Sequence, residues 1–342
     1  MAIIETAQLR KIFKTRYSVV EAVRGVDMRV DEGEIFGFLG PNGAGKTTML
    51  RMLTTLLPPS SGQARVAGCD VQREPARVRE RIGYVSQSGG VDNNATGREN
   101  LLLQARLYRI DKPAIRAAEL LAALELEACA DRIARTYSGG QRRRLDVALG
   151  MVHRPRLLFL DEPTTGLDPQ SRAWLWNEVR SLRAAGTTIF LTTHYLEEAD
   201  ALCDRLAIID GGRIVAEGTP TALKRSVAHD VITFGLDVYN DTLQRAQDLL
   251  RGQPFVHELH ASKDELRLYV SQGNTTLPVI MQLCANAGIS INSIALAHPT
   301  LDDVFLRLTG HSLRDEGPEE HKAAGYDWKA KATGSKKKAG AR

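Results

Sequence analysis

The chain has 342 residues, of which 43% are hydrophobic and 25% are charged, and this composition excludes a wholly disordered or fibrous protein. At about 150 residues per domain, the length predicts two domains. The net charge of +4 is unevenly spread, because residues 321–342 carry seven basic residues and one acid, a net +6, which leaves −2 for the first 320 residues and argues against a basic nucleic-acid-binding body.

The first part of the chain, residues 1–222, alternates apolar strand-like runs with amphipathic stretches, which predicts an α/β domain. The expected strands are residues 34–39, 82–85, 157–160, 188–192 and 206–209. A helix is expected from Lys46 to the residues before Pro58, because proline cannot continue a helix. A stretch rich in Leu, Ala, Glu and Arg, about residues 88–152, predicts a helical subdomain between the second and third strands.

Residues 223–312 follow a different pattern. The expected strands 231–238, 255–260, 265–270 and 290–297 alternate with the expected helices 241–251 and 276–287. This βαββαβ order predicts a small ferredoxin-like α+β domain with its own core. Because that core is separate, a chain that ends near Lys224 is expected to fold by itself.

A last helix is expected over residues 301–308, with Leu301, Val304, Phe305 and Leu308 on one face. Two interpretations of this apolar face remain open: it covers the sheet of its own domain, or it packs against a second copy of the chain. Residues 313–342 are rich in Gly, Ala and Lys and are expected to form a disordered basic tail, either inert or in contact with anionic lipid.

A glycine-rich run follows the first expected strand and leads into the first expected helix. It reads Gly40-Pro41-Asn42-Gly43-Ala44-Gly45-Lys46-Thr47, followed by Thr48, and fits G-x-x-x-x-G-K-[ST] in the strand–turn–helix setting that the motif needs. Its backbone N–H groups and the helix N-terminus are expected to bind phosphate. Lys46 is expected to contact the β- and γ-phosphates and the Thr47 hydroxyl to bind Mg²⁺.

Two carboxylates end a buried strand. The run Leu157-Leu158-Phe159-Leu160-Asp161-Glu162 brings them to the carboxyl edge of the expected sheet, where ligands bind in open α/β sheets. Asp161 is expected to hold Mg²⁺, and Glu162 is expected to polarise the water that attacks the γ-phosphate. A solvated acidic turn is the alternative, and the neighbouring phosphate-binding loop disfavours it.

The run Tyr137-Ser138-Gly139-Gly140-Gln141 resembles the LSGGQ signature of ATP-binding cassette (ABC) proteins. The other motifs of that family occur in its order: Gln87 after strand 82–85, Asp161-Glu162, Gly166-Leu167-Asp168, and Thr193-His194 after strand 188–192. The chain is identified as a member of the ABC family. The resemblance implies a P-loop NTPase fold, an ABC nucleotide-binding domain with a helical subdomain, and an ATPase that uses ATP and Mg²⁺.

The resemblance also implies a second copy of the chain, because two cassettes of this family face each other head to tail. Ser138, Gly139, Gly140 and Gln141 are then expected to contact ATP held by the phosphate loop of the other copy. Asp168 is expected to join the two copies.

Further roles near the γ-phosphate come from the same resemblance. Gln87 is expected to contact Mg²⁺ and the γ-phosphate, and His194 to hydrogen-bond to the γ-phosphate and orient the water. Phe13 is expected to stack on adenine, with Tyr17 as the second candidate and simple packing as the alternative. Stacking does not read base edges, so a preference for ATP over GTP is not encoded there.

Two details depart from simple family patterns. Tyr137 occupies the position where leucine is usual, and it is expected to serve as apolar packing without loss of activity. The run Arg142-Arg143-Arg144 is interpreted as a solvated helix face rather than a nucleic-acid contact.

Four segments, residues 96–101, 162–169, 193–200 and 299–305, resemble the daunorubicin/doxorubicin-resistance group of type-2 ABC exporters. No apolar run approaches the ~20 residues that span a bilayer, so the membrane-spanning permease is expected to be another polypeptide. The first residues lack a signal sequence, and the four cysteines lie at least 60 positions apart, as expected in a reducing cytoplasm. The expected location is the inner face of the cytoplasmic membrane.

The expected function is to power export of a drug, antibiotic or lipid-like substrate. The alternative is a soluble ABC-type ATPase that acts on nucleic acid or ribosomes. DNA-repair relatives carry a long coiled coil before the signature, whereas Lys46 and Ser138 are only 92 positions apart without a heptad array, and ribosome-acting relatives carry two cassettes. A non-catalytic module is disfavoured by Glu162 and His194. No nucleic-acid partner is expected.

Overall fold

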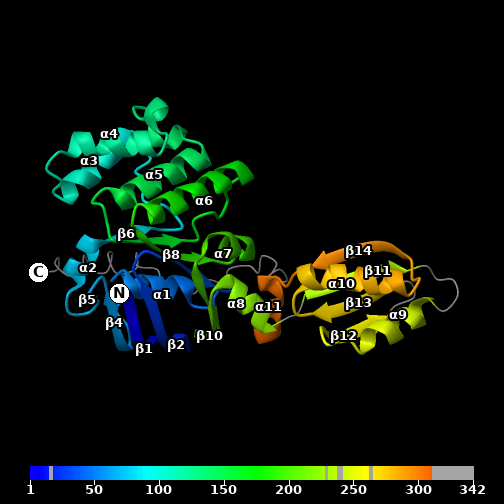
Figure 1. Ribbon diagram of the computed structural model, residues 1–342. Helices are drawn as coiled ribbons and strands as arrows, with labels where there is room; N and C mark the ends of the chain where they lie inside the picture. The colour runs from blue at the N-terminus through cyan, green and yellow to red at the C-terminus, as the bar shows by residue number, and fades with distance from the viewer. Residues whose placement is uncertain (15–17, 228–229, 237–241, 262–264, 310–342) are drawn as a thin grey trace, which may run out of the picture.

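The computed structural model describes residues 1–14, 18–227, 230–236, 242–261 and 265–309. Its first part contains two sheets, with the helices α3 to α6 on one side of the larger sheet, and a smaller α+β unit lies beside α8 and α11 (Figure 1). The predicted tail and the candidate Tyr17 lie outside the described residues.

The larger sheet has the strand order β10-β9-β3-β8-β7-β6. Its strands are β3 (Ile35–Leu39), β6 (Ile82–Val85), β7 (Leu157–Asp161), β8 (Thr188–Thr193), β9 (Arg205–Asp210) and β10 (Arg213–Gly218). All are parallel except β10, which pairs antiparallel with β9 at one edge. The five predicted strands are confirmed, whereas β10 was not predicted.

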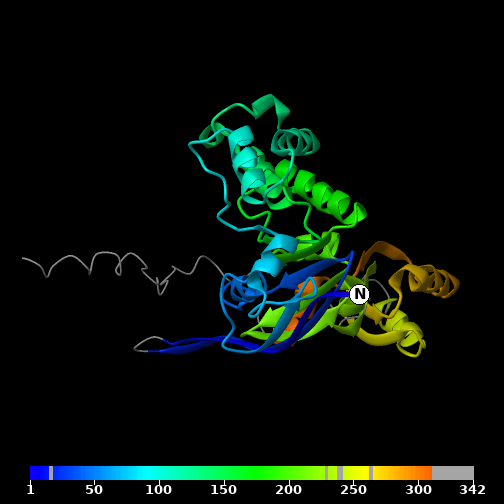
Figure 2. The ribbon, with the colours of Figure 1, turned by 90° about the vertical axis from the view of Figure 1, so that its left-hand side faces the viewer.

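A second, antiparallel sheet was also not predicted. It has the order β2-β1-β4-β5, formed by β1 (Ala2–Lys14), β2 (Val19–Asp31), β4 (Ser61–Val66) and β5 (Cys69–Asp70). The helix α1 (Lys46–Leu53) packs between the two sheets, where Met49, Leu50, Met52 and Leu53 are buried beside side chains of β1, β2 and β3. The far ends of β1 and β2 project from the body (Figure 2).

The other face of the larger sheet supports the predicted helical subdomain. It contains α3 (Gly97–Leu107), α4 (Pro113–Ala123), two short 3₁₀ helices (Glu127–Cys129 and Ala134–Thr136) and α5 (Gly139–Met151). Alternate residues of β7 serve the two cores: Leu157 and Phe159 face the α1 side, while Leu158 and Leu160 face the helices. Three helices complete the first part or lie against it: α2 (Pro75–Arg81), α6 (Pro169–Ala184) and α7 (Leu196–Leu202).

The smaller unit has the predicted βαββαβ order. Its elements are β11 (Asp230–Leu236), α9 (Thr242–Arg251), β12 (Val256–Ala261), β13 (Glu265–Val270), α10 (Gly273–Asn286) and β14 (Ile291–Ala297). The sheet order β12-β13-β11-β14, with antiparallel neighbours, is the arrangement expected of a ferredoxin-like unit. It has its own core around Ile232, Phe234 and Leu268. The exact domain boundaries remain predictions.

The last helix corrects both interpretations of its apolar face. Helix α11 (Leu301–Thr309) lies against α8 (Pro220–Val227), α7 and β10, and Leu301, Val304 and Phe305 are buried in the core of the first part of the same chain. Leu308, which was predicted to share this face, is 41% exposed. Leu301, Val304 and Phe305 therefore cover the first part of the chain rather than the sheet of their own unit, and because they are buried there they are not available to a second copy.

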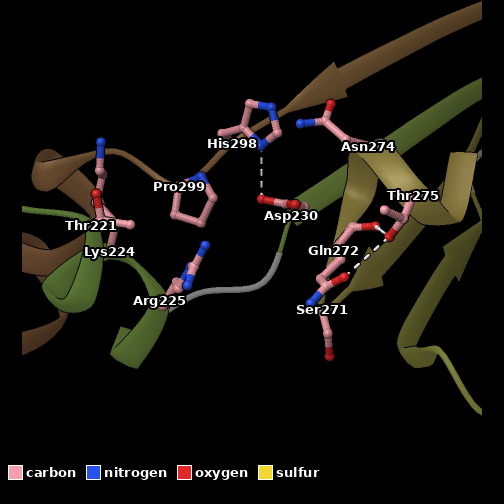
Figure 3. Close-up of a pocket in the computed structure, with 10 residues that line it drawn as sticks. All are labelled: Thr221, Lys224, Arg225, Asp230, Ser271, Gln272, Asn274, Thr275, His298 and Pro299. Carbon is pink, nitrogen blue, oxygen red and sulfur yellow. Dashed lines mark hydrogen bonds and ion pairs between the residues drawn. The ribbon is translucent and has the colours of Figure 1, made fainter.

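The chain thus enters and leaves the smaller unit at one place. Asp230 begins β11, His298 follows β14, and their side chains are joined by a 2.9 Å contact between His298 Nδ1 and Asp230 Oδ1 (Figure 3). A pocket of about 620 Å³ lies at this junction, with Arg225 of α8 on one side and Gln272 at the start of α10 on the other (Figure 3).

Candidate active site

The predicted motifs meet at the carboxyl ends of the parallel strands. The phosphate loop follows β3, the two carboxylates end β7, Gln87 follows β6 and His194 follows β8. These loops border a pocket of about 450 Å³. Its lining includes predicted residues from all four motifs: Pro41, Asn42, Gly43, Gly45, Lys46, Thr47, Thr48, Gln87, Glu162 and His194.

The phosphate loop has the backbone that a phosphate cradle needs. Gly43 has φ +81° and Gly45 has φ +104°, values that favour glycine, and a Cβ on Gly45 would lie 2.3 Å from the Ala22 carbonyl oxygen. Gly40 is equally confined, because its Cβ would lie 2.2 Å from the Ile209 carbonyl oxygen. The loop closes with a hydrogen bond from Ala44 N–H to the Pro41 carbonyl, at 3.3 Å.

Lys46 is buried at the start of α1, with 4% of its surface exposed. Its Nζ donates to the carbonyls of Gly40 (2.7 Å) and Pro41 (3.0 Å) and forms an ion pair with Glu162 Oε1 at 3.3 Å. The ammonium group therefore lies inside the loop, where it is available to a bound phosphate.

Asp161 is held at the end of β7 by two hydroxyl groups. Thr192 Oγ1 donates to Asp161 Oδ1 at 2.7 Å, and Thr47 Oγ1 donates to the same oxygen at 3.3 Å. Burial raises the pKa of Asp161, and the Glu162 charge adds to the rise, while the two hydroxyls oppose it. A hydroxyl beside a buried carboxylate forms the all-oxygen donor set that Mg²⁺ prefers, so these residues fit the ion.

Glu162 contacts side chains from the other motifs of the site. Its φ is +44°, and its main-chain N–H donates to the Thr192 hydroxyl at 3.0 Å. Gln87 Nε2 donates to Oε2 at 3.0 Å, and His194 Nδ1 lies 3.2 Å from the same oxygen. Burial pushes the pKa of Glu162 upward, but the adjacent His194 ring and the Lys46 charge outweigh it, and the pKa is lowered.

Thr192 and Thr165 belong to the site but were not predicted. Thr165 lines the pocket, with its hydroxyl 3.4 Å from Glu162 Oε2. Thr192 was assigned only to a strand, and only its position opposite Asp161 in the adjacent strand reveals its role. A strand-end threonine gives no motif signal, because its function depends on which strand lies beside it.

Ser138, Gly139, Gly140 and Gln141 lie outside this pocket. Ser138 and Gln141 form a capping box at the start of α5, with Gln141 N–H donating to Ser138 Oγ at 3.2 Å. A Cβ on Gly139 would meet nothing within 4 Å. Ser138 and Gly139 are thus exposed to a molecule outside the chain, whereas a Cβ on Gly140 would lie 2.5 Å from Ser171 Oγ.

Asp168 is exposed and caps α6. Its carboxylate accepts a hydrogen bond from Ser171 N–H at 2.9 Å, and hydrogen bonds from Ser171 lower its pKa. Phe13, on β1, does not line the pocket and is 40% exposed, with Lys11 Nζ 5.3 Å from its ring centre. Its stacking on adenine remains a prediction.

Two sequence interpretations near the signature need revision. Tyr137 packs against the helical core as predicted, but its hydroxyl also donates to the Cys129 carbonyl at 2.6 Å. The interpretation of the arginine run as a solvated face is wrong for Arg143, which is 7% exposed. Arg143 is buried because several main-chain carbonyls surround its guanidinium group.

Comparison with known proteins agrees with this site. A family model described as "ABC transporter" matches residues 23–165, and one described as "ATP-binding protein DrrA1-3-like, C-terminal domain" matches residues 218–309. The daunorubicin/doxorubicin resistance ATP-binding protein DrrA of Streptomyces peucetius is 45% identical, with 93% of this chain and 95% of that protein aligned. The chain therefore belongs to the ABC transporter family and is one of its ATP-binding ATPases.

Other relatives place the chain more narrowly. The doxorubicin resistance ATP-binding protein DrrA of Mycobacterium tuberculosis is 42% identical, covering 85% of this chain and 89% of that protein. Nod factor export ATP-binding protein I of Cupriavidus metallidurans is 39% identical, covering 92% and 99%. A solved dimeric ATP-binding cassette bound to ADP and Pi has a TM-score of 0.59 at 25% identity, covering 63% of this chain and 98% of that one. The chain resembles drug-resistance and export ATP-binding proteins along most of its length, and these relatives give no support to action on nucleic acid or ribosomes.

Proposed function

We propose that the chain is the ATP-hydrolysing subunit of an exporter that moves a drug, antibiotic or lipid-like substrate through a separate membrane-spanning permease. The observation that carries the proposal is Glu162, held between Lys46, Gln87 and His194 at the pocket edge. The resistance and export names of the relatives support the direction of transport and the substrate class.

Bound ATP would change the surroundings of Glu162. In the structure, Lys46 neutralises part of the Glu162 charge. A triphosphate offers Lys46 a stronger partner, so the ammonium turns to the phosphates and the carboxylate is left as a stronger base. Glu162 can then accept a proton from the attacking water, while His194 orients that water and the γ-phosphate.

Thr47, Asp161 and Gln87 are the residues that would hold Mg²⁺. The ion would neutralise charge that develops on the phosphate oxygens. Asp161 and Thr47 already share a hydrogen bond, so their oxygens are gathered before the ion arrives.

The proposed partners are a second copy and a permease. The exposed start of α5 supports a head-to-tail dimer in which Ser138, Gly139 and Gly140 bind ATP held by the other copy.

None of the helices in the described residues has the length and apolar content needed to cross a bilayer. A permease contact is supported by Leu103 and Leu107 of α3, which are 57% and 68% exposed. They belong to the helical subdomain, and Gln104 of α3 and Tyr108, which follows α3, line a groove that reaches Tyr84 of β6.

Glu162→Gln tests the catalytic assignment. The amide keeps the side-chain shape but cannot accept the proton, so ATP hydrolysis by the full chain should fall by about 10²–10⁴-fold while ATP still binds. The variant should accumulate as an ATP-bound dimer in size-exclusion chromatography with ATP and Mg²⁺. When the chain is produced with its permease, the same change should remove drug efflux. A variant that stays monomeric and hydrolyses ATP at the normal rate would contradict the proposal.

A further inference from the structure

Two buried charged residues follow the signature on α5. Arg143 is 7% exposed and Asp146 is 5% exposed, and the i, i+3 spacing puts them on one face of the helix. Neither contacts the pocket that would bind ATP. Burying a charge is costly unless it is paired and hydrogen-bonded, so their partners indicate what they hold in place.

Arg143 joins α5 to both sides of the catalytic turn. Its Nη1 donates to the Ser86 carbonyl at 2.9 Å, and Ser86 immediately precedes Gln87. Its Nε donates to the Pro163 carbonyl at 2.8 Å, and its Nη2 to the Asp161 carbonyl at 3.4 Å. Asp161 and Pro163 flank Glu162 in the sequence. One planar guanidinium therefore holds the Gln87 loop and the Glu162 turn against the signature helix.

Asp146 holds the other end of the Gln87 loop. The main-chain N–H of Gly90 donates to Asp146 Oδ1 at 2.7 Å. Gly89 has φ +77°, and a Cβ there would lie 2.7 Å from Asp146 Oδ2, so the loop approaches the carboxylate closely. Burial raises the pKa of Asp146, while the Gly90 hydrogen bond and the Arg143 charge oppose the rise. The α5 side chains of Arg143 and Asp146 thus form hydrogen bonds to the two ends of segment 86–90.

We propose that Arg143 and Asp146 are positioning residues that make the signature helix, the Gln87 loop and the Glu162 turn move as one body. The inference rests on the proposed ATPase function and deepens it. Gln87 Nε2 and Glu162 Oε2 are 3.0 Å apart. A displacement of these two side chains by the γ-phosphate would therefore move their sequence neighbours Ser86 and Pro163. Arg143 passes that displacement to α5, whose N-terminus faces the second copy. The state of a chain's own nucleotide would thereby set the signature offered to its partner.

Full-chain Arg143→Met tests this coupling, because methionine retains apolar bulk but donates no hydrogen bond. ATP affinity should stay within about twofold of wild type in a fluorescent-nucleotide titration, since the phosphate loop makes its contacts through β3 and α1. The rate constant kcat for ATP hydrolysis should fall at least tenfold. In a Glu162→Gln background, ATP-driven dimerisation should weaken by a similar factor.

Conservative variants separate positioning from simple packing. Arg143→Lys keeps the charge without the planar fork, so its kcat should lie between wild type and Arg143→Met. Asp146→Asn keeps an oxygen for the Gly90 N–H and should retain most of the rate that Asp146→Ala loses. If Arg143→Lys and Asp146→Asn lose as much rate as Arg143→Met and Asp146→Ala, the hydrogen bonds are not what couples the elements, and the inference is overturned.

Arg116→Met is the matched control. Arg116 also donates to two main-chain carbonyls, those of Val152 (2.9 Å) and Met151 (2.7 Å), but both belong to the helical subdomain. The Arg116→Met variant should lower the melting temperature, but it should not lower kcat while leaving ATP affinity unchanged. If wild type hydrolyses ATP but Arg143→Met behaves like Arg116→Met, the coupling inference is overturned and the proposed function is not. Absence of hydrolysis by wild type would instead contradict the proposed function.

Discussion

At the scale of single residues, the site is organised around one ion pair. Lys46 and Glu162 are both buried, at 4% and 8% exposure, and each compensates the other's charge. This pairing also protects Glu162, whose pKa would rise on burial without Lys46 and His194. In the proposed reaction, a bound phosphate would replace the Glu162 carboxylate as the partner of Lys46.

Lys46→Ala should abolish tight ATP binding, because it removes the only cation that the described part of the pocket directs at the phosphates. A fluorescent-nucleotide titration measures the loss, and a thermal melt tests whether the fold survives. The matched control is Lys112→Ala, since Lys112 is exposed at the start of α4 and does not line the pocket. Unchanged nucleotide affinity in Lys46→Ala would refute the assignment of the phosphate loop.

The same variant should change how stability depends on pH. The folded pKa of Glu162 is lowered, so its contribution to stability is present above the unfolded value of 4.5 and is lost as the pH falls through the folded value. Without Lys46 the folded pKa rises, and this contribution shrinks or reverses. Melting temperatures of wild type and Lys46→Ala should therefore differ more at neutral pH than at a pH below the lowered folded pKa of Glu162.

At the scale of elements, within the first part of the chain the sequence predicted the strands that are buried on both faces and missed β1, β2 and β10, which are half exposed. β3 and β7 are continuous apolar runs with a motif at their carboxyl end, which makes them easy to recognise. β1 and β2 are interrupted by register shifts, for example between Thr6 and Leu9, so their alternation of apolar and polar residues breaks. The motif residues could be predicted in the same way, whereas Thr192 and Arg143 depend on tertiary neighbours.

Helix α11 is the element whose contacts could not be read from periodicity. Its apolar face was predicted correctly for Leu301, Val304 and Phe305, but a pattern of spacing does not identify the surface that covers it. Those side chains pack with Leu223 of α8 and the core of the first part of the chain. This contact makes α11 part of the ATPase body, although it follows the smaller unit in the sequence.

Phe305→Ala should therefore destabilise the nucleotide-binding part of the chain by about 3–5 kcal/mol, because Phe305 is fully buried and its removal leaves a cavity. Thermal or chemical denaturation followed in that part, with ATP affinity as a second readout, measures the effect. Leu308→Ala is the control, since Leu308 is 41% exposed and should cost no more than about 0.5 kcal/mol. Equal effects of the two substitutions would show that α11 does not pack as described.

At the scale of the whole molecule, the position of α11 revises the expectation that a chain ending near Lys224 folds by itself. Such a truncation removes Leu301, Val304 and Phe305 from the core, and each buried side chain of this kind contributes about 1.5–3 kcal/mol. The apolar surface on α7, α8 and β10 would then face water.

The truncated chain should aggregate or melt well below wild type, whereas a chain that lacks residues 230–297 but keeps α11 through a short linker should remain folded and bind ATP. Size-exclusion chromatography, thermal melts and nucleotide titration compare the two deletions. If the truncation ending at Lys224 is as stable as the internal deletion, α11 contributes nothing to the ATPase body.

The joined entry and exit of the smaller unit also have a mechanical consequence. A domain on a single linker can swivel, and little torque passes through the linker. Here Asp230 and His298 tie the two crossings together, and α11 packs against α8, β10 and α7, the helix that follows His194. A rotation of the smaller unit would therefore act on the ATPase as a lever with two fixed points, close to the loop that carries His194.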